Sequence, residues 1–379
     1  MVTNHKIKVI HIAQSAGGVA EYIKDLLGHL DEEKYENILI VSNDYEEQKE
    51  INKICKKIFY VDMIRKILFK KDIQAILKIR RIIKQEKPDI LYLHSSKAGA
   101  LGRIATFFCG RVKIIYNAHG WYFNADISNK KKKFFEWIEK ILAFKTNKII
   151  AISKSEYDSA IQKGICKEHK IALIENGIDI KKYNDYSKYR ESIRKKYKIK
   201  KNDVVIGIVG RISEQKDPIT SIKAACQIIK QDNSVYCMFV GTGDLKEEVL
   251  KIAKENQIDS NIIITGWVDE VKKYIATFDI ALLPSKWEGF GLAILEYMVC
   301  KKPIIATNIG GIANILQPDR AFFIEKENAN DIVRQYKNIL NNPQIPYIVE
   351  ENYKECINKY SIERVALQTE SIFKEVLKY

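Results

Sequence analysis

The 379-residue chain lacks the features that mark several large classes of protein. Its seven cysteines form no C-x-x-C pair, have no histidine at zinc spacing, and are odd in number, so they cannot all pair within one chain. We therefore expect a reducing compartment, the cytoplasm, and no structural zinc. No apolar run approaches the roughly 18 residues of a membrane span. The start, MVTNHKIKVIHIA, does not read as a signal peptide.

The net charge of +15 is unevenly distributed, because the first half of the chain carries all of the excess basic residues. Residues 1–200 hold 41 Lys and Arg against 24 Asp and Glu, whereas residues 201–379 hold 22 against 24. Residues 51–150 alone hold 23 basic and 7 acidic side chains. This pattern is typical of a solvated surface or of one that meets an anionic membrane. No recognisable nucleic-acid-binding motif accompanies the charge, so we expect no nucleic-acid partner.

The stretch MIRKILFKKDIQAILKIRRIIKQ, within the basic region, has apolar residues at approximately helical spacing. These residues are Ile64, Ile67, Leu68, Ile73, Ile76, Leu77, Ile82 and Ile83. The spacing predicts a helix with one apolar and one basic face. We expect the apolar face to pack on the domain. The basic face is then either solvated or adsorbs to anionic lipid without insertion.

Strand-like runs alternate with helical patterns along the whole chain. In the first half, strands are expected at 6–13, 37–41, 57–61, 89–93, 113–117, 147–152 and 170–174. The turn-rich stretch 175–203 interrupts the pattern, which restarts at VVIGIVGRI and continues through VYCMFVG, NIIITG, DIALLP, PIIAT and AFFIE. This alternation predicts two α/β domains in tandem, each with a doubly wound parallel sheet.

Ligands of such sheets bind beyond the carboxyl ends of the strands, and several candidate residues fall there. Gly17 and Gly18 follow the first strand and would let backbone N–H groups approach a phosphate or sugar, although a glycine pair is also an ordinary turn. Arg211 and Lys216, in GRISEQK, suit a diphosphate, although exposed loop cations are often only solvated. Lys246 replaces the third glycine of a dinucleotide fingerprint in FVGTGDL, which disfavours a nicotinamide dehydrogenase.

The stretch SKWEGFGLAILE combines Glu288 and Glu296 with a glycine-rich turn at the start of a helix. Backbone N–H groups at this start would form an anion site; they belong to Phe290, Gly291 and Leu292. Glu288 would then reach sugar hydroxyls and Glu296 the ribose of a nucleotide. Either glutamate alone is as readily a helix cap or a surface residue.

With these motifs in place, the chain resembles the retaining GT-B glycosyltransferases of family 4 over essentially its whole length. The resemblance rests on the E-x7-E pattern from Glu288 to Glu296 and on GRISEQK, GTGDL, ISKSE and ENGID. It implies an α/β GT-B fold, in which two Rossmann-like doubly wound domains face a central cleft. Residues 1–175 would form the acceptor domain and 176–360 the donor domain, with a closing helix at 361–379 that crosses back to the first domain.

The resemblance also implies roles for individual residues. Glu288 would contact the donor sugar and Glu296 the ribose, while Arg211 and Lys216 would neutralise the diphosphate. His119, in YNAHGW, would lie near the anomeric carbon. The implied catalytic residues are His119, Arg211, Lys216 and Glu288, and the implied donor-binding residues are Gly17, Gly18, Phe290, Gly291, Leu292 and Glu296. No D-x-D motif is present, so we expect neither a metal ion nor a cofactor.

The implied reaction moves a sugar from a nucleotide diphosphate, with UDP preferred, to a hydroxyl group with retention of configuration. LYLHSSKAGALGRIA and AHGWYFN resemble members that build bacterial capsular or exopolysaccharides on a lipid carrier. We therefore expect a saccharide acceptor that is linked to a lipid carrier, and a cytoplasmic enzyme that lies peripherally on the inner face of the cell membrane. A UDP-sugar 2-epimerase and a non-catalytic subunit that binds sugar nucleotides are the alternatives.

Overall fold

The computed structural model describes residues 6–14, 17–42, 51–64, 66–107, 109–110 and 112–378. The chain divides into two compact units, Met1–Gly177 with Ile362–Tyr379 and Ile178–Ser361. From the sequence we expected this boundary after residue 175. Within the described residues, no helix is both long and apolar enough to cross a membrane.

The first unit is built on a parallel sheet of seven strands in the order β3-β2-β1-β4-β5-β6-β7. The strands are β1 (Ile7–Ala13), β2 (Tyr35–Val41), β3 (Lys57–Tyr60), β4 (Ile90–His94), β5 (Lys113–Asn117), β6 (Lys148–Ala151) and β7 (Ile171–Leu173). Each begins and ends within two residues of its predicted run. Runs of Ile, Val and Leu identify them because strands covered by helices on both faces are apolar on both sides.

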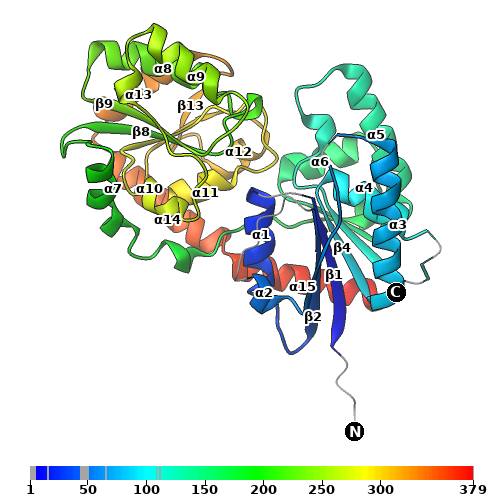
Figure 1. Cartoon of the computed structure of the whole chain (residues 1–379). Coiled ribbons are helices and arrows are strands. Elements are labelled where there is room, and N and C mark those ends of the chain that lie inside the picture. The colour runs from blue at the N-terminus through cyan, green and yellow to red at the C-terminus, as the bar shows by residue number, and fades with distance from the viewer. Residues whose placement is uncertain are drawn as a thin grey trace. The chain divides into compact units, whose positions relative to one another are not determined.

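Helices cover both faces of this sheet (Figure 1). One face carries α3 (Phe69–Glu86), α4 (Ser96–Ala105), α5 (Asn129–Ala143) and α6 (Lys154–Gln162). The other carries α1 (Gly18–Leu27) and the C-terminal helix α15 (Ile362–Lys378), whose Val365 and Phe373 are buried with residues of β1 and β2. The predicted closing helix therefore returns to the first unit.

The predicted apolar face of the basic helix is wrong in part. The buried residues of α3 are Ala75, Ile79, Ile82, Ile83 and Glu86. Ile73 and Leu77 are instead 41% and 55% exposed, and Ile67 and Leu68, which precede the helix, are 63% and 40% exposed. At about 100° per residue, Ile73 and Leu77 lie on the side of α3 opposite the buried stripe. The helix thus carries two apolar stripes, which the sequence pattern merged into one.

The motif SKAGALGR in α4 has a packing role. A Cβ atom at Gly99 would lie 2.3 Å from the ring of Tyr116, and one at Gly102 would lie 2.4 Å from Leu93. The fully buried Arg103 donates from Nη2 to Glu139 of α5 at 2.8 Å. Only glycine lets α4 lie this close to β4 and β5.

The second unit contains a parallel sheet of six strands in the order β10-β9-β8-β11-β12-β13. The strands are β8 (Val204–Val209), β9 (Val235–Val240), β10 (Ile262–Ile264), β11 (Ile280–Leu283), β12 (Ile304–Thr307) and β13 (Phe322–Ile324). One face is covered by α8 (Pro218–Gln231), α9 (Lys246–Glu255) and α13 (Ala329–Leu340); the other carries α10 (Val271–Ile275) and α11 (Leu292–Val299) (Figure 1). Helices α12 (Gly310–Ile315) and α14 (Ile345–Lys359) also belong to this unit.

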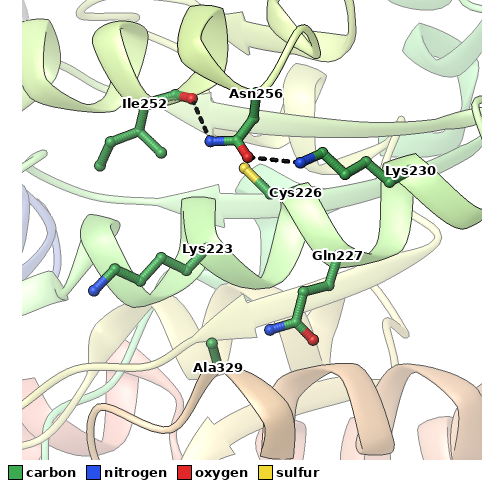
Figure 2. Close-up of a pocket in the computed structure, with 7 residues that line it drawn as sticks. All are labelled: Lys223, Cys226, Gln227, Lys230, Ile252, Asn256 and Ala329. Atoms are coloured by element: carbon green, nitrogen blue, oxygen red, sulfur yellow. Dashed lines mark hydrogen bonds between the residues drawn. The ribbon is translucent and has the colours of Figure 1, made fainter.

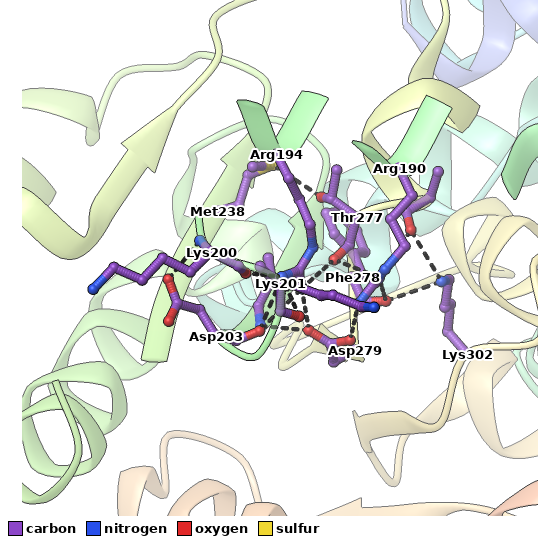
Figure 3. A network of polar contacts seen from close by, with 12 residues as sticks. Arg190, Arg194, Lys200, Lys201, Asp203, Met238, Thr277, Phe278, Asp279 and Lys302 are labelled. Carbon is purple, nitrogen blue, oxygen red and sulfur yellow. Dashed lines mark hydrogen bonds and ion pairs between the residues drawn. The ribbon is translucent and has the colours of Figure 1, made fainter. Parts of the chain in front are cut away.

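The predicted linking stretch belongs mostly to the second unit. It forms two short 3-10 helices (Ile180–Tyr183 and Tyr186–Tyr189) and α7 (Arg190–Lys196). Figure 3 shows the polar network that fixes α7, in which Arg190 and Arg194 share the carboxylate of Asp279 at 2.5 and 2.7 Å. Burial, together with the nearby Arg190, lowers the pKa of Lys302 in this network to about 8. These contacts hold the segment against the ends of the sheet strands.

Candidate functional site

Two predicted motifs of the second unit meet where its strand order reverses, between β8 and β11. The backbone N–H of Lys286 donates to the carbonyl of Gln215 at 2.8 Å, and Nε2 of Gln215 donates to the carbonyl of Trp287 at 3.1 Å. The loop after β8, which holds GRISEQK, therefore lies along the loop after β11, which holds the E-x7-E pattern. This reversal point is the usual ligand position in open α/β sheets.

Lys216 and Glu288 form an ion pair between Nζ and Oε1 in this junction. Oγ of Ser285 donates to the same carboxylate oxygen at 3.1 Å. The two charged side chains are only 18% and 9% exposed, and the lysine stem crosses Gly210 so closely that a Cβ there would be 3.1 Å from Cε. A cation and a carboxylate that the sequence placed in separate motifs are thus a single, largely buried pair.

Gly291 begins α11 in the left-handed region, at φ 97° and ψ 61°, where glycine is strongly favoured. A Cβ on Gly311 of α12 would lie 2.4 Å from the carbonyl of Gly289, so the turn is packed tightly from behind. Phe290 is buried, with its ring 5.8 Å from that of Tyr360, and Leu292 is half-buried. Their side chains are therefore structural, and the donor-binding role predicted for them concerns their backbone N–H groups.

Glu296 lies in the second turn of α11, where its Oε1 accepts a hydrogen bond from the hydroxyl of Tyr183 at 2.8 Å. The helix itself is held to β8 by Tyr297, whose hydroxyl accepts from the N–H of Val209 at 2.7 Å. Sequence reasoning missed Tyr183, because no periodicity connects the 3-10 helix after ENGID to α11. Arg211, at the end of β8, has an exposed side chain.

The glycines of GTGDL serve loop packing. A Cβ on Gly241 would lie 2.1 Å from the carbonyl oxygen of Gly210, and one on Gly243 would lie 2.3 Å from that of Ile212. The loops after β8 and β9 therefore touch through their backbones. This packing accounts for the partial likeness to a dinucleotide fingerprint.

In the first unit, the candidate residues lie at the carboxyl ends of β1, β4 and β5. His119 follows β5 with a φ of 52°, and Ser95 follows β4 with a φ of 76°. Non-glycine residues held in this region are often found at functional sites. Gly17, at φ 100°, and Gly18 begin α1, from which the ring of Tyr22 meets that of His119 edge-on at 4.7 Å. The predicted glycine pair and His119 are therefore on the same edge of the sheet.

Three histidines form a hydrogen-bonded chain behind this edge. Nε2 of His119 lies 3.1 Å from Nδ1 of His94, Nε2 of His94 lies 3.2 Å from Nδ1 of His11, and Nε2 of His11 lies 3.3 Å from Oδ1 of Asn37. Burial lowers the pKa of His119 to about 3 and that of His11 to about 4, and lowers that of His94 well below its usual value. All three rings are therefore neutral near pH 7. Sequence reasoning found only His119.

The ISKSE motif supports the loop that follows His119. Glu156 accepts hydrogen bonds from the backbone N–H of Trp121 at 2.6 Å and from Nδ2 of Asn124 at 3.0 Å. Its own N–H donates to Ser153, the N-cap of α6, at 3.2 Å. Burial raises the pKa of the Glu156 carboxyl to about 7. This contact ties the loop 121–124 to the start of α6.

A surface pocket of about 320 Å³ lies elsewhere on the second unit, between α8, α9 and the start of α13 (Figure 2). Lys230 donates to Asn256 at 2.8 Å within it. None of the predicted site residues is among those that line it. As for metals, the described part of the chain holds no group of three or more His, Cys, Asp or Glu residues placed to bind an ion.

Comparison with known proteins identifies the family. The sequence model described as Glycosyltransferase Family 4 matches residues 16–182, and that described as Glycosyl transferases group 1 matches residues 189–360. A Klebsiella pneumoniae protein, the uncharacterized 41.2 kDa protein in the cps region, is 31% identical over 86% of this chain and 88% of its own. The chain belongs to glycosyltransferase family 4. Its enzyme class, glycosyltransferase, and the resemblance seen in its motifs are thereby confirmed.

Two further similarities bear on this glycosyltransferase. The Escherichia coli UDP-Gal:alpha-D-GlcNAc-diphosphoundecaprenol alpha-1,3-galactosyltransferase is 26% identical, over 95% of each chain. The crystal structure of Anabaena HepE in complex with UDP and glucose superposes with a TM-score of 0.83 at 17% identity, covering 97% of this chain and 99% of that one. The second similarity confirms the predicted fold class, GT-B with two Rossmann-like domains.

Proposed function

We propose that this glycosyltransferase moves a sugar from a UDP-sugar to a saccharide carried on a lipid diphosphate, with retention of configuration. The Escherichia coli relative, whose name specifies UDP-galactose and a diphosphoundecaprenol acceptor, supports both substrates. The name of the Klebsiella relative, with its cps region, supports a role in bacterial surface polysaccharide synthesis. The observation that carries the proposal is the Lys216–Glu288 pair, which joins two family motifs at the strand-order reversal.

The donor would be held by the loops around that pair. Positive charge on Arg211 and Lys216, together with the backbone N–H groups at the start of α11, would stabilise the diphosphate as it leaves. Glu288 would accept from hydroxyls of the sugar and Glu296 from those of the ribose. In the first unit, His119 would meet hydroxyls of the transferred sugar, and the turn at Gly17 and Gly18 would approach the donor with its backbone.

The proposed reaction exchanges one bond at the anomeric carbon for another on the same face. The bond to the diphosphate oxygen breaks, the acceptor hydroxyl oxygen bonds to the carbon, and the acceptor proton passes to the leaving diphosphate. Fixed cations supply the charge stabilisation, so we propose that the reaction requires neither a metal ion nor a cofactor. Transfer rates in excess EDTA should therefore equal those in Mg²⁺.

We also propose that the enzyme attaches to the membrane, and the exposed face of α5 supports this. Phe134, Trp137 and Ile141 of the helix and its C-cap residue Phe144 recur at helical spacing and are 48%, 60%, 44% and 85% exposed. Exposed lysines accompany this stripe, namely Lys130, Lys131, Lys133 and Lys140. Basic residues beside exposed aromatic rings are typical of helices that lie in a membrane interface.

The outer face of α3, on the same side of the sheet, has a similar composition. Phe69, Ile73 and Leu77 are 79%, 41% and 55% exposed, and Lys70 and Arg81 are exposed beside them. From the sequence we expected adsorption without insertion, because Ile73 and Leu77 were assigned to the face that packs on the domain. Their exposure supports shallow insertion of side chains instead. The enzyme would thus act from the cytoplasm, peripherally, on the inner face of the membrane.

The decisive experiment is a transfer assay with a panel of UDP-, GDP- and dTDP-sugars and a polyprenyl-diphosphate-linked N-acetylglucosamine acceptor. We expect transfer from one UDP-sugar and a product with the donor's anomeric configuration by NMR. Interconversion of the donor without transfer would instead establish the 2-epimerase, and donor binding without turnover would establish the non-catalytic subunit. Transfer with inversion would overturn the proposed stereochemistry.

A further inference from the structure

The histidine chain of the first unit extends from the loop after β5 to the interior of the sheet. His119 is partly exposed, whereas His94 and His11 are completely buried and Asn37 nearly so. The successive rings are stacked, with centroids 5.3 Å apart for His119 and His94 and 5.5 Å apart for His94 and His11. Strands β1, β2 and β4 and the loop after β5 each contribute one member, so the chain has little freedom to rearrange.

Asn37 sets the direction of the hydrogen bonds. Its Oδ1 can only accept, so Nε2 of His11 carries a proton and donates. In a neutral ring the other nitrogen is then an acceptor, and Nδ1 of His11 accepts from Nε2 of His94. By the same step, Nδ1 of His94 accepts from Nε2 of His119. Each ring is thus held in the Nε2–H tautomer.

The other ring nitrogen of His119, Nδ1, lies at the outer end of the chain. Within the residues that the structure describes, no hydrogen bond is made by its Nδ1. This nitrogen carries a lone pair and accepts a hydrogen bond when Nε2 holds the proton. A hydroxyl group of a sugar is a donor of the matching kind.

We propose that His94 and His11 are positioning residues, which hold His119 in one ring orientation and one tautomer so that its Nδ1 accepts a hydrogen bond from a donor-sugar hydroxyl. This inference rests on the proposed function for the identity of the ligand, a sugar hydroxyl. His94 and His11 would then act only through His119, without contact to the substrate. The group that hydrogen-bonds the other ring nitrogen of a functional histidine commonly fixes its tautomer.

A proton relay along the chain is the competing explanation, and its far end argues against it. The amide of Asn37 does not titrate, so a proton that entered at His119 would have no outlet there. Charging His94 or His11 would also place an unpaired cation among buried groups. The chain therefore suits fixed orientation and a permanent acceptor.

Nitrogen NMR of uniformly ¹⁵N-histidine-labelled, full-length protein at pH 7.5 tests the tautomer directly and needs no activity. We expect the His119 ring to show a protonated Nε2 and an unprotonated Nδ1, assigned by comparison with His119→Gln. In His94→Leu, the two His119 nitrogens should move toward a tautomer average. A protonated Nδ1 in the wild type, or an unchanged pattern in His94→Leu, would overturn the inference.

Kinetics with the UDP-sugar found in the panel provide the second test. His94→Leu should lower kcat about tenfold or more, the usual scale for removing the partner that orients a functional histidine, with much less change in KM. His94→Asn offers an acceptor close to the position of Nδ1, so it should recover most of the lost rate. Equal rates in the Asn and Leu variants would show that His94 matters only for packing.

The two tests separate this inference from the proposed function. If the enzyme transfers no sugar, the NMR pattern still decides whether the chain fixes the tautomer. If His94→Leu does not fold, the wild-type spectrum and the His94→Asn rates remain decisive.

Discussion

Lys216 and Glu288 are 72 residues apart in the sequence, yet their side chains form one ion pair at the carboxyl edge of the second sheet. The pair links the motif expected to bind the diphosphate with the motif expected to bind the sugar. A donor bound at this site would compete with Glu288 for the Lys216 ammonium group and with Lys216 for the Glu288 carboxylate. The two residues should therefore behave as one unit in mutagenesis.

Lys216→Ala and Glu288→Ala should each cost about 2–4 kcal/mol of transition-state stabilisation, and the double variant should cost clearly less than their sum, because each single change leaves a poorly solvated partner charge. Arg211→Ala removes an exposed cation and should cost a similar amount of transition-state stabilisation. This cost should add to that of Lys216→Ala or of Glu288→Ala. The measurement is kcat/KM for all variants, with circular dichroism as the folding control. Rates within a factor of two of wild type for Arg211→Ala and Lys216→Ala would refute the site.

The two glutamates should separate in their effects. Glu296→Ala should mainly weaken binding of free UDP, by about 1–2 kcal/mol, because a hydrogen-bonding carboxylate is lost from the ribose. Glu288→Ala should mainly lower kcat. Tyr183→Phe is the matched control, since it removes only the hydroxyl that holds Glu296 and should weaken UDP binding by less. Calorimetric titration with UDP measures this, and equal losses for both glutamate variants would contradict the assignment.

Vesicle binding should rise with anionic lipid content and fall with salt, because surface charge acts over roughly 10 Å at 0.1 M salt. Reversal of four basic residues on and before α3 should abolish it; these are Lys66, Lys70, Lys71 and Arg81. The matched control reverses four exposed lysines of the second unit, namely Lys251, Lys254, Lys326 and Lys337. If the first variant sediments with vesicles as the wild type does, the basic face is only solvated.

Insertion of apolar side chains predicts a separate effect. Trp137→Ala and Phe144→Ser together should weaken vesicle binding without changing its salt dependence, whereas Leu367→Ser on α15, where Leu367 is 69% exposed, should have no effect. In the wild type, vesicles should shift tryptophan emission to the blue, and Trp137→Phe should remove the shift. A wild-type spectrum unaffected by anionic vesicles would exclude insertion at α5.

The buried histidines should make stability depend on pH. Burial holds the pKa of His11 at about 4, below its unfolded value near 6.5, so the unfolded state binds the proton first as the pH falls. The free energy of unfolding should decrease by about 3 kcal/mol from this residue between pH 6.5 and 4. The raised pKa of Glu156 has the opposite effect, because it should increase the free energy of unfolding as the pH falls from about 7 to 4.5.

The contribution of His11 is isolated by comparing denaturant unfolding of the wild type and His11→Asn at pH 7 and pH 5. Because Glu156 is common to both proteins, its effect cancels in the difference. The wild type should lose more stability than the variant over this interval. Parallel pH dependence in the two proteins would show that His11 is not held neutral.

Gly99→Ala should destabilise the first unit by about 1–3 kcal/mol, since its new methyl group would overlap the Tyr116 ring. Gly28→Ala is the control, because its φ of −69° suits alanine and its Cβ would meet only ordinary contacts of 3.4 Å or more. Thermal unfolding in the absence of UDP compares the melting temperatures of the two variants. Equal melting temperatures would show that α4 can shift away from β5 without loss.

The sequence by itself determined the α/β class, the strand positions and the family. Strands that are buried on both faces appear in the sequence as short runs of Ile, Val and Leu. Glu288, Gly291 and Glu296 lie within one turn and the helix that follows it, so their spacing can be recognised in the sequence. The same locality explains the error in α3, because helical periodicity identifies an apolar stripe but not which stripe meets the sheet. Only the fold decided that Ile79 is buried and Leu77 exposed.

Only the tertiary structure decided which distant residues meet. The strand order brought Lys216 to Glu288, and the pairing of β1 with β4, which aligns His11 with Tyr92, brought the ring of His94 within hydrogen-bonding distance of that of His11. Tyr183 reaches Glu296 from a segment whose sequence carries no period at all. Contacts of this kind depend on the crossover connections between strands and on backbone approach at glycines such as Gly99 and Gly241, which no local pattern encodes.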